Sequence, residues 1–127
     1  MDPTDRRYTS EHEWVKLEGD VAVVGITDFA QDQLGDVVYV ELPKVGDRVE
    51  AMKPFGVVES VKTASDLFAP IGGTIAEVND RLTDEPQLVN DAPYGSGWMI
   101  KIQPDDPAAI DNLMTAQQYA DQVAGSS

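Results

Sequence analysis

The apolar residues of this chain come in short runs, and this feature most limits the folds open to it. Valine is twice as frequent as leucine, with 15 residues against 7, and β-branched side chains favour strands. Turn residues interrupt the runs about every ten positions, a spacing typical of sandwiches and barrels. No run approaches the roughly 18 apolar residues of a membrane-spanning helix. The pattern therefore predicts an all-β protein built from many short strands.

Turn and capping residues divide the chain into candidate elements. We expect a hairpin from residues 12–17 and 21–26, which flank the turn Glu18-Gly19-Asp20. Thr27 is placed to cap a short helix that Gly35 ends. The remaining expected strands cover residues 36–42, 48–51, 56–61, 66–69, 74–79 and 98–102.

From residue 105 onward the sequence pattern predicts helices instead of strands. Asp106 and Pro107 begin one expected helix over residues 108–114, and Thr115 begins a second that runs to about residue 124. The 127 residues fit a single domain, 1–127, with a flexible segment at 1–7 and a C-terminal helical segment at 105–124. The expected architecture is a sandwich or flattened barrel with a few peripheral helices.

The charge balance limits the partners of the chain. Lys and Arg number 9 against 23 Asp and Glu, which gives a net charge of −14. Such a surface repels nucleic acids and anionic membranes and attracts basic patches on proteins, although solubility alone also explains it. The chain has no cysteine, and its N-terminus resembles neither a secretory signal nor a transit peptide. We therefore expect a cytoplasmic protein without disulfides.

Residues able to form a catalytic or metal centre are scarce. His12 is the only histidine, which excludes a paired-histidine metal site, and the sequence has neither a phosphate-binding glycine loop nor a Gly-x-Ser-x-Gly motif. Asp28 and Asp32 share a helix face and Asp105 adjoins Asp106, but a solvated face and a helix cap explain these carboxylates. The sequence predicts neither catalysis by this chain nor a metal site.

One lysine stands apart. Lys62 lies between two expected strands, where a tight turn exposes its side chain near Glu59 and Asp66. A nucleophilic lysine needs a desolvated site that lowers its pKa, and this acidic, solvated turn is the opposite. Lys62 is suited instead to be acylated by another enzyme, and the alternative is an ordinary solvated turn lysine.

The segment Gly56-Val57-Val58-Glu59-Ser60-Val61-Lys62 resembles the lipoylation site of the glycine cleavage system H-protein family. Further blocks resemble this family in the same order over about residues 8–102, and the helical tail lies where the family has one. These blocks are Tyr8-Thr9, His12-Glu13-Trp14-Val15, Val24-Gly25-Ile26-Thr27-Asp28, Leu34-Gly35-Asp36-Val37-Val38, Val40-Glu41-Leu42-Pro43, Gly73-Thr74-Ile75, Glu77-Val78-Asn79, Leu88-Val89-Asn90, Pro93-Tyr94 and Gly97-Trp98-Met99-Ile100-Lys101-Ile102.

The resemblance implies a hybrid lipoyl/biotinyl-type sandwich of two antiparallel sheets with Lys62 at a hairpin tip. It implies that lipoic acid is attached to Lys62 as an amide, with Glu59, Ser60, Val61 and Thr63 as the context that lipoylating enzymes recognise. The implied role is a carrier in glycine catabolism and one-carbon metabolism, with no turnover of its own.

Three enzymes are the implied partners of the carrier. A pyridoxal-phosphate glycine decarboxylase loads an aminomethyl group, a tetrahydrofolate-dependent aminomethyltransferase removes it, and dihydrolipoamide dehydrogenase reoxidises the dithiol. The resemblance also implies a cleft for the loaded arm, in which Glu11, Glu13 and Asp66 accept from its ammonium. We expect His12 and Trp14 to be packing residues, and a monomer suits a protein that docks with several enzymes.

Alternatives remain at this point. Ala51-Met52-Lys53 resembles the start of a biotin-acceptor sequence, but Pro54 replaces its second methionine, and Lys53 is expected well away from the hairpin tip. A similar lipoyl scaffold that relays lipoate to 2-oxoacid dehydrogenases is a second reading. A third is an acidic interaction module in which Lys62 stays unmodified.

Overall fold

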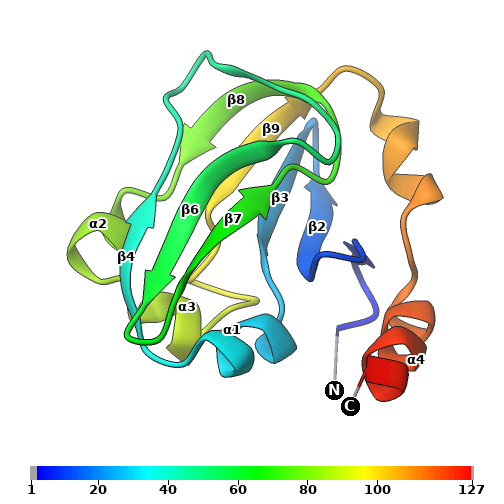
Figure 1. Cartoon of the computed structure of the whole chain (residues 1–127). Coiled ribbons are helices and arrows are strands. Elements are labelled where there is room, and N and C mark those ends of the chain that lie inside the picture. The colour runs from blue at the N-terminus through cyan, green and yellow to red at the C-terminus, as the bar shows by residue number, and fades with distance from the viewer. Residues whose placement is uncertain (1–2, 127) are drawn as a thin grey trace.

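Two antiparallel β-sheets face each other in the computed structural model, which describes residues 3–126 (Figure 1). Within these residues the larger sheet has six strands in the order β1-β2-β3-β9-β8-β5, and the smaller has three in the order β4-β6-β7. The larger sheet contains β1 (Arg7–Tyr8), β2 (Glu13–Glu18), β3 (Val21–Ile26), β9 (Ile100–Pro104), β8 (Gly73–Val78) and β5 (Arg48–Val49). The smaller sheet contains β4 (Val37–Glu41), β6 (Pro54–Ser60) and β7 (Ala64–Phe68).

Short helices surround the sheets. They are α1 (Asp28–Leu34), α2 (Arg81–Asp84), α3 (Leu88–Asp91), the 3-10 helix η1 (Pro107–Asn112) and α4 (Ala116–Ser126). In Figure 1, α1 and α3 lie at the end of the molecule where β6 and β7 meet, whereas η1 and α4 lie beside β2. In residues 3–126, no helix is long and apolar enough to cross a membrane.

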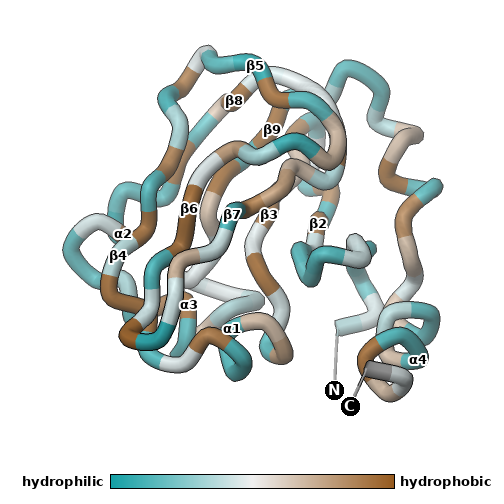
Figure 2. The backbone as a smooth tube through the Cα atoms, viewed as in Figure 1, coloured by the Kyte–Doolittle hydropathy of each residue, from teal (hydrophilic) through white to brown (hydrophobic). Residues whose placement is uncertain are grey.

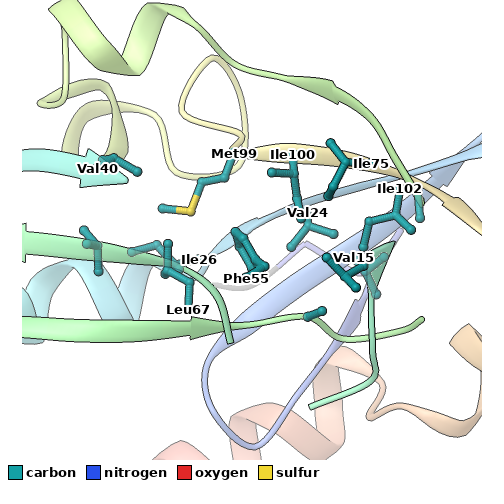
Figure 3. Packing of buried hydrophobic residues seen from close by; sticks show 14 of the residues in the cluster. Val15, Val24, Ile26, Val40, Phe55, Leu67, Ile75, Met99, Ile100 and Ile102 are labelled. Atoms are coloured by element: carbon teal, nitrogen blue, oxygen red, sulfur yellow. The ribbon is translucent and has the colours of Figure 1, made fainter. Parts of the chain in front are cut away.

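The main core fills the space between the two sheets (Figure 3). Strand alternation turns Val15, Val24 and Ile102 of the larger sheet toward Val58 and Leu67 of the smaller one. All five side chains are at most 2% exposed. Burying one such side chain contributes about 1.5–3 kcal/mol, so this interface is the main source of the stability of the fold.

A second apolar cluster covers the opposite face of β2 and β3. It contains Tyr8, Trp14, Val23 and Tyr119. Gly25 is opposite Trp14 in the strand pairing, and a Cβ at Gly25 would lie 2.7 Å from the indole ring. The rings of Tyr8 and Tyr119 stack with their centroids 4.9 Å apart, which packs α4 against the N-terminal strand.

The predicted sandwich of two antiparallel sheets with peripheral helices is confirmed. The hairpin of β2 and β3 and the helix caps at Thr27, Gly35 and Asp106 lie where the sequence predicts them. Strands β1 and β5 are only two residues long, and β1, α2 and α3 were not predicted from the sequence.

Arg6 and Arg7, in the segment 1–7, both contact the larger sheet. Arg7 pairs with Val15 in the larger sheet. The guanidinium of Arg6 lies 4.5 Å from the ring centroid of Trp14, a cation–π contact. The flexibility expected for residues 1–7 stays a prediction, and Met1 and Asp2 lie outside the described residues.

Candidate functional site

A three-residue loop joins β6 to β7 and carries Lys62. The strands pair from Pro54 opposite Phe68 to Glu59 opposite Ala64. The N–H of Ser60 donates to the carbonyl of Thr63 at 2.8 Å, and the Ser60 hydroxyl oxygen accepts from the N–H groups of Lys62 and Thr63 at 3.2 Å each. The serine therefore fixes the loop from within, and Lys62 is exposed at its tip.

The far end of the Lys62 side chain lies against the end of α1. A Cβ at Gly35 would be 3.2 Å from Cε of Lys62. Gly35 has φ of 79° and caps α1 by donating its N–H to Gln31. The N–H of Val61 donates to the carbonyl of Asp36 at 3.0 Å. The hairpin tip is thereby positioned by the segment that joins α1 to β4.

A groove of about 470 Å³ runs between α1, β7 and the segment before β2. Its apolar lining includes Phe29 and Leu34 of α1 and Leu67 and Phe68 of β7. Leu34 also precedes Gly35, on which the Lys62 side chain rests. The other lining residues are Glu11, His12, Glu13, Ile26, Ala30, Gln33, Val58, Ser65 and Asp66.

Glu13 is the buried carboxyl of the groove. It is only 2% exposed, accepts from the Thr9 hydroxyl at 2.6 Å and accepts from the N–H of Phe68 at 3.3 Å. Burial raises the pKa of Glu13 to about 7, against the opposing effect of these two hydrogen bonds. Glu13 thus links β2 of one sheet to β7 of the other and changes charge near neutral pH.

His12 lies beside Glu13 in the groove wall. Its Nδ1 is 2.8 Å from the hydroxyl of Tyr119, which also contacts Thr27 Oγ1 at 2.7 Å. The imidazole packs 4.9 Å from the ring of Phe29, and burial lowers the pKa of His12, which favours the neutral ring. His12 both packs and faces the groove, whereas the sequence predicted packing alone.

The carboxylates predicted for a cleft do line one groove, at different depths. Glu13 is buried, whereas Glu11 and Asp66 are exposed. Strand alternation puts Asp66 opposite Val57 and on the other face of β7 from Leu67, so Asp66 belongs to the rim. The sequence did not identify Phe29 and Leu34 as groove residues, although their spacing in the predicted helix indicated a shared face.

Lys53 lies outside this site. It precedes β6, whereas Lys62 follows it, so the length of the strand separates the two lysines. Its carbonyl accepts from the N–H of Ala69 at 2.9 Å, at the end of the hairpin opposite the tip. Among residues 3–126, no group of three His, Cys, Asp or Glu residues is arranged to hold a metal ion.

A sandwich that presents an exposed lysine on a hairpin tip, next to an apolar groove, defines a carrier domain that other enzymes act upon. The profile of the glycine cleavage H-protein family matches residues 6–125. The glycine cleavage system H protein of Bacillus pumilus (strain SAFR-032) is 62% identical to this chain, and that of Bacillus subtilis (strain 168) is 58% identical. Both alignments span 117 residues, which is 92% of this chain and 92% of the relative.

A solved structure gives the same result. The crystal structure of a glycine cleavage system H protein from Mycobacterium marinum superposes with a TM-score of 0.89 at 45% identity, covering 97% of this chain and 99% of that one. The chain belongs to the glycine cleavage H-protein family, whose members are the lipoyl carriers of the glycine cleavage system and not catalysts. Members of this family carry lipoate covalently on a lysine, so the reading as an unmodified interaction module is set aside.

Proposed function

We propose that Lys62 is the lysine that carries lipoate and that the groove receives the lipoyl arm. The observation that carries this proposal is the position of Lys62, exposed at a hairpin tip with its side chain resting beside the groove. The other four lysines of the chain are Lys16, Lys44, Lys53 and Lys101. Lys16 and Lys101 form ion pairs on the larger sheet, and Lys44 and Lys53 lie before β5 and β6, away from the tip.

The groove residues fit an acyl arm. Apolar side chains of Phe29, Leu34 and Leu67 suit an alkyl chain. When attached, the lipoyl group supplies a dithiolane that accepts an aminomethyl group and, later, is restored by oxidation of the dithiol. The chain itself contributes carboxylates along the groove and a wall that limits access of water.

We assign Glu13, Glu11 and Asp66 as acceptors for the ammonium of the loaded arm. Glu13 lies deepest, and an adjacent cation would favour its ionised form and lower its pKa from about 7. A carboxylate that keeps the amine protonated removes the nitrogen lone pair that would expel the sulfur. The groove would thereby slow hydrolysis while the carrier moves between enzymes.

The proposed partners are the three enzymes of glycine cleavage and an enzyme that attaches lipoate. They are the pyridoxal-phosphate glycine decarboxylase, the tetrahydrofolate-dependent aminomethyltransferase and dihydrolipoamide dehydrogenase. A net charge of −14 supports docking on basic surfaces. The proposal includes a monomeric carrier that shares the cytoplasm with these enzymes, and Glu59, Ser60, Val61 and Thr63 as the local context for lipoylation.

The test is the intact mass, with peptide mapping, of the chain after incubation with lipoate, ATP and a lipoate–protein ligase. We expect one lipoyl adduct on Lys62 in the wild type and none in Lys62→Arg. The fold should tolerate this exposed substitution within about 0.5 kcal/mol. Lys53→Arg is the matched control and should be modified like the wild type. An adduct on Lys53 or on any lysine other than Lys62 contradicts the assignment.

A further inference from the structure

Three large apolar side chains are exposed together beside Lys62. Val38 is 54% exposed, Tyr39 is 48% exposed and Val61 is 68% exposed. Val38 and Tyr39 belong to β4, and Val61 immediately precedes Lys62. We call these three residues the β4 patch. Figure 2 shows hydrophobic colour at the start of β4, beside the turn that joins β6 to β7.

An irregularity in β4 creates this patch. The pairing of β4 with β6 shifts between Val37 and Tyr39, so the strand does not alternate there. Val37 and Val40 are buried in the core, whereas both residues between them face outward. A bulge of this kind re-aims side chains, and here it places two apolar side chains in succession on the surface.

The backbone holds the patch next to the hairpin tip and away from the groove. The N–H of Val61 donates to the carbonyl of Asp36, one residue before β4. The groove lies along β7, and β4 and β7 are the two edges of the smaller sheet. An enzyme seated on the patch therefore reaches Lys62 from the side opposite the groove.

Acidic side chains surround the patch. Glu59 is paired directly with Tyr39 across the two strands, and Glu41 follows on the same strand. Asp36 precedes the strand, and all three carboxylates are exposed. The complementary partner has an apolar centre for the patch and basic groups around it.

We propose that the β4 patch is the docking surface for the enzyme that attaches lipoate, an inference that rests on the proposed function of Lys62. Of the partners proposed above, this enzyme alone must bring its reactive centre to Nζ of Lys62. The others act at the far end of a flexible arm, which carries the reacting atoms away from the hairpin tip. An apolar surface one residue from the acylated lysine is therefore best matched to the acylating enzyme.

The step that docking serves is amide formation on Nζ. The ammonium of Lys62 loses a proton to a base of the enzyme, and the amine attacks the carbonyl carbon of lipoyl adenylate, a mixed anhydride made from lipoate and ATP with release of pyrophosphate. A C–N bond forms, the acyl–oxygen bond to AMP breaks, and the nitrogen loses a second proton. No electron transfer is involved.

The experiment measures the initial rate of lipoylation by intact mass, with a lipoate–protein ligase, lipoate and ATP, over a range of carrier concentrations. The test variant is the double substitution Val38→Ser with Tyr39→Ser, which leaves every residue of the lipoylation context unchanged. The control is the double substitution Leu17→Ser with Val45→Ser, because Leu17 is 45% exposed and Val45 is 63% exposed. These two residues match the patch residues in exposure but lie in β2 and in the loop before β5.

We expect the patch variant to show a KM for the carrier raised about tenfold or more, with kcat retained, because docking is weakened while Lys62 is intact. The control variant should match the wild type, and thermal unfolding confirms that both variants are folded. A patch variant with wild-type kinetics overturns the inference but leaves Lys62 as the lipoylated residue.

Two further outcomes distinguish failure of the docking proposal from failure of the assignment of Lys62. If the wild type gains no lipoyl mass, the assignment of Lys62 fails and the inference fails with it. If the patch variant is lipoylated normally but, once lipoylated, is a poor substrate of the glycine decarboxylase, the patch serves that enzyme and the inference is overturned.

Discussion

Glu13 is the residue whose surroundings differ most from those of an ordinary strand carboxyl. Its folded-state pKa of about 7 lies above the unfolded value of 4.5 because burial favours the neutral form. The folded state therefore binds more protons than the unfolded state between these values. The contribution of Glu13 to the free energy of unfolding should therefore be greatest below pH 4.5. This contribution should fall by up to about 3 kcal/mol as the pH rises to 7.

The measurement is urea unfolding at a series of pH values across that window, compared between the wild type and Glu13→Gln. The amide stays neutral, so the variant should lose this downward slope. Glu41→Gln is the control, because Glu41 is an exposed glutamate of the smaller sheet, and it should keep the slope of the wild type. Equal slopes for the wild type and Glu13→Gln would show that Glu13 is not the group responsible.

The sequence can predict that the side chain of Glu13 points inward, but it cannot predict the groups that hydrogen-bond to it. Alternation along a strand puts Glu13 on the same face as Val15, which is a core residue. The Thr9 hydroxyl and the N–H of Phe68 that hold it come from 4 residues before and 55 residues after it. No local pattern relates such separated groups, so the bridge between the sheets emerges only in the folded chain.

At the scale of elements, Tyr119 links α4 to the segment before α1. The hydroxyl of Tyr119 contacts His12 and Thr27, and Thr27 also caps α1 by accepting from Ala30. We predict that Tyr119→Phe lowers the free energy of unfolding by about 1–3 kcal/mol, because the buried Thr27 hydroxyl loses this partner.

Denaturant unfolding at neutral pH measures this cost. Gln117→Ala is the control on the same helix, because Gln117 is exposed, and it should change the stability by less than about 0.5 kcal/mol. Equal stabilities of Tyr119→Phe and Gln117→Ala would mean that ring packing alone, and not the hydroxyl, holds α4 in place.

Elements with local signals are the ones that the sequence predicts well. Thr27 and Gly35 cap α1 through contacts within the helix itself, and these residue types favour caps wherever they occur. The four-residue helix α3 has no side-chain cap. Asn90 holds it instead, by donating to the carbonyl of Gly35 and accepting from the N–H of Val37. Such a helix depends on the segments around it and leaves no periodic signal.

At the scale of the whole molecule, the net charge of −14 should make association with enzymes sensitive to salt. We expect kcat/KM for lipoylation of the carrier to fall about tenfold between 0.01 M and 0.15 M salt, as the Debye length shortens from about 30 Å to 8 Å. The measurement is the initial rate at carrier concentrations below KM. Sucrose at equal osmolality is the control and should leave the rate unchanged, whereas a rate independent of salt would contradict electrostatic attraction.

The strand content of the molecule follows from short apolar runs and regular turns, but the order of the strands does not. Neighbouring strands β2 and β3 form a hairpin that the turn predicts. The pairing of β3 with β9 joins residues almost 80 positions apart, such as Val24 with Ile100. Burial of two separate apolar faces selects that pairing. The resemblance to a known family implied two antiparallel sheets but gave no order of the strands.

Gly35 has two structural roles, one in the backbone of α1 and one beneath the Lys62 side chain. Its left-handed backbone ends α1, and the absence of a side chain leaves the surface on which the Lys62 side chain rests. A larger residue would strain the turn and push the lysine outward in one change. On the proposal that Lys62 carries lipoate, the reach of the attached arm is measured from Nζ of Lys62, and the end of α1 supports the side chain that holds this atom. Under that proposal, the end of one short helix determines the point from which the arm extends toward each enzyme that acts on it.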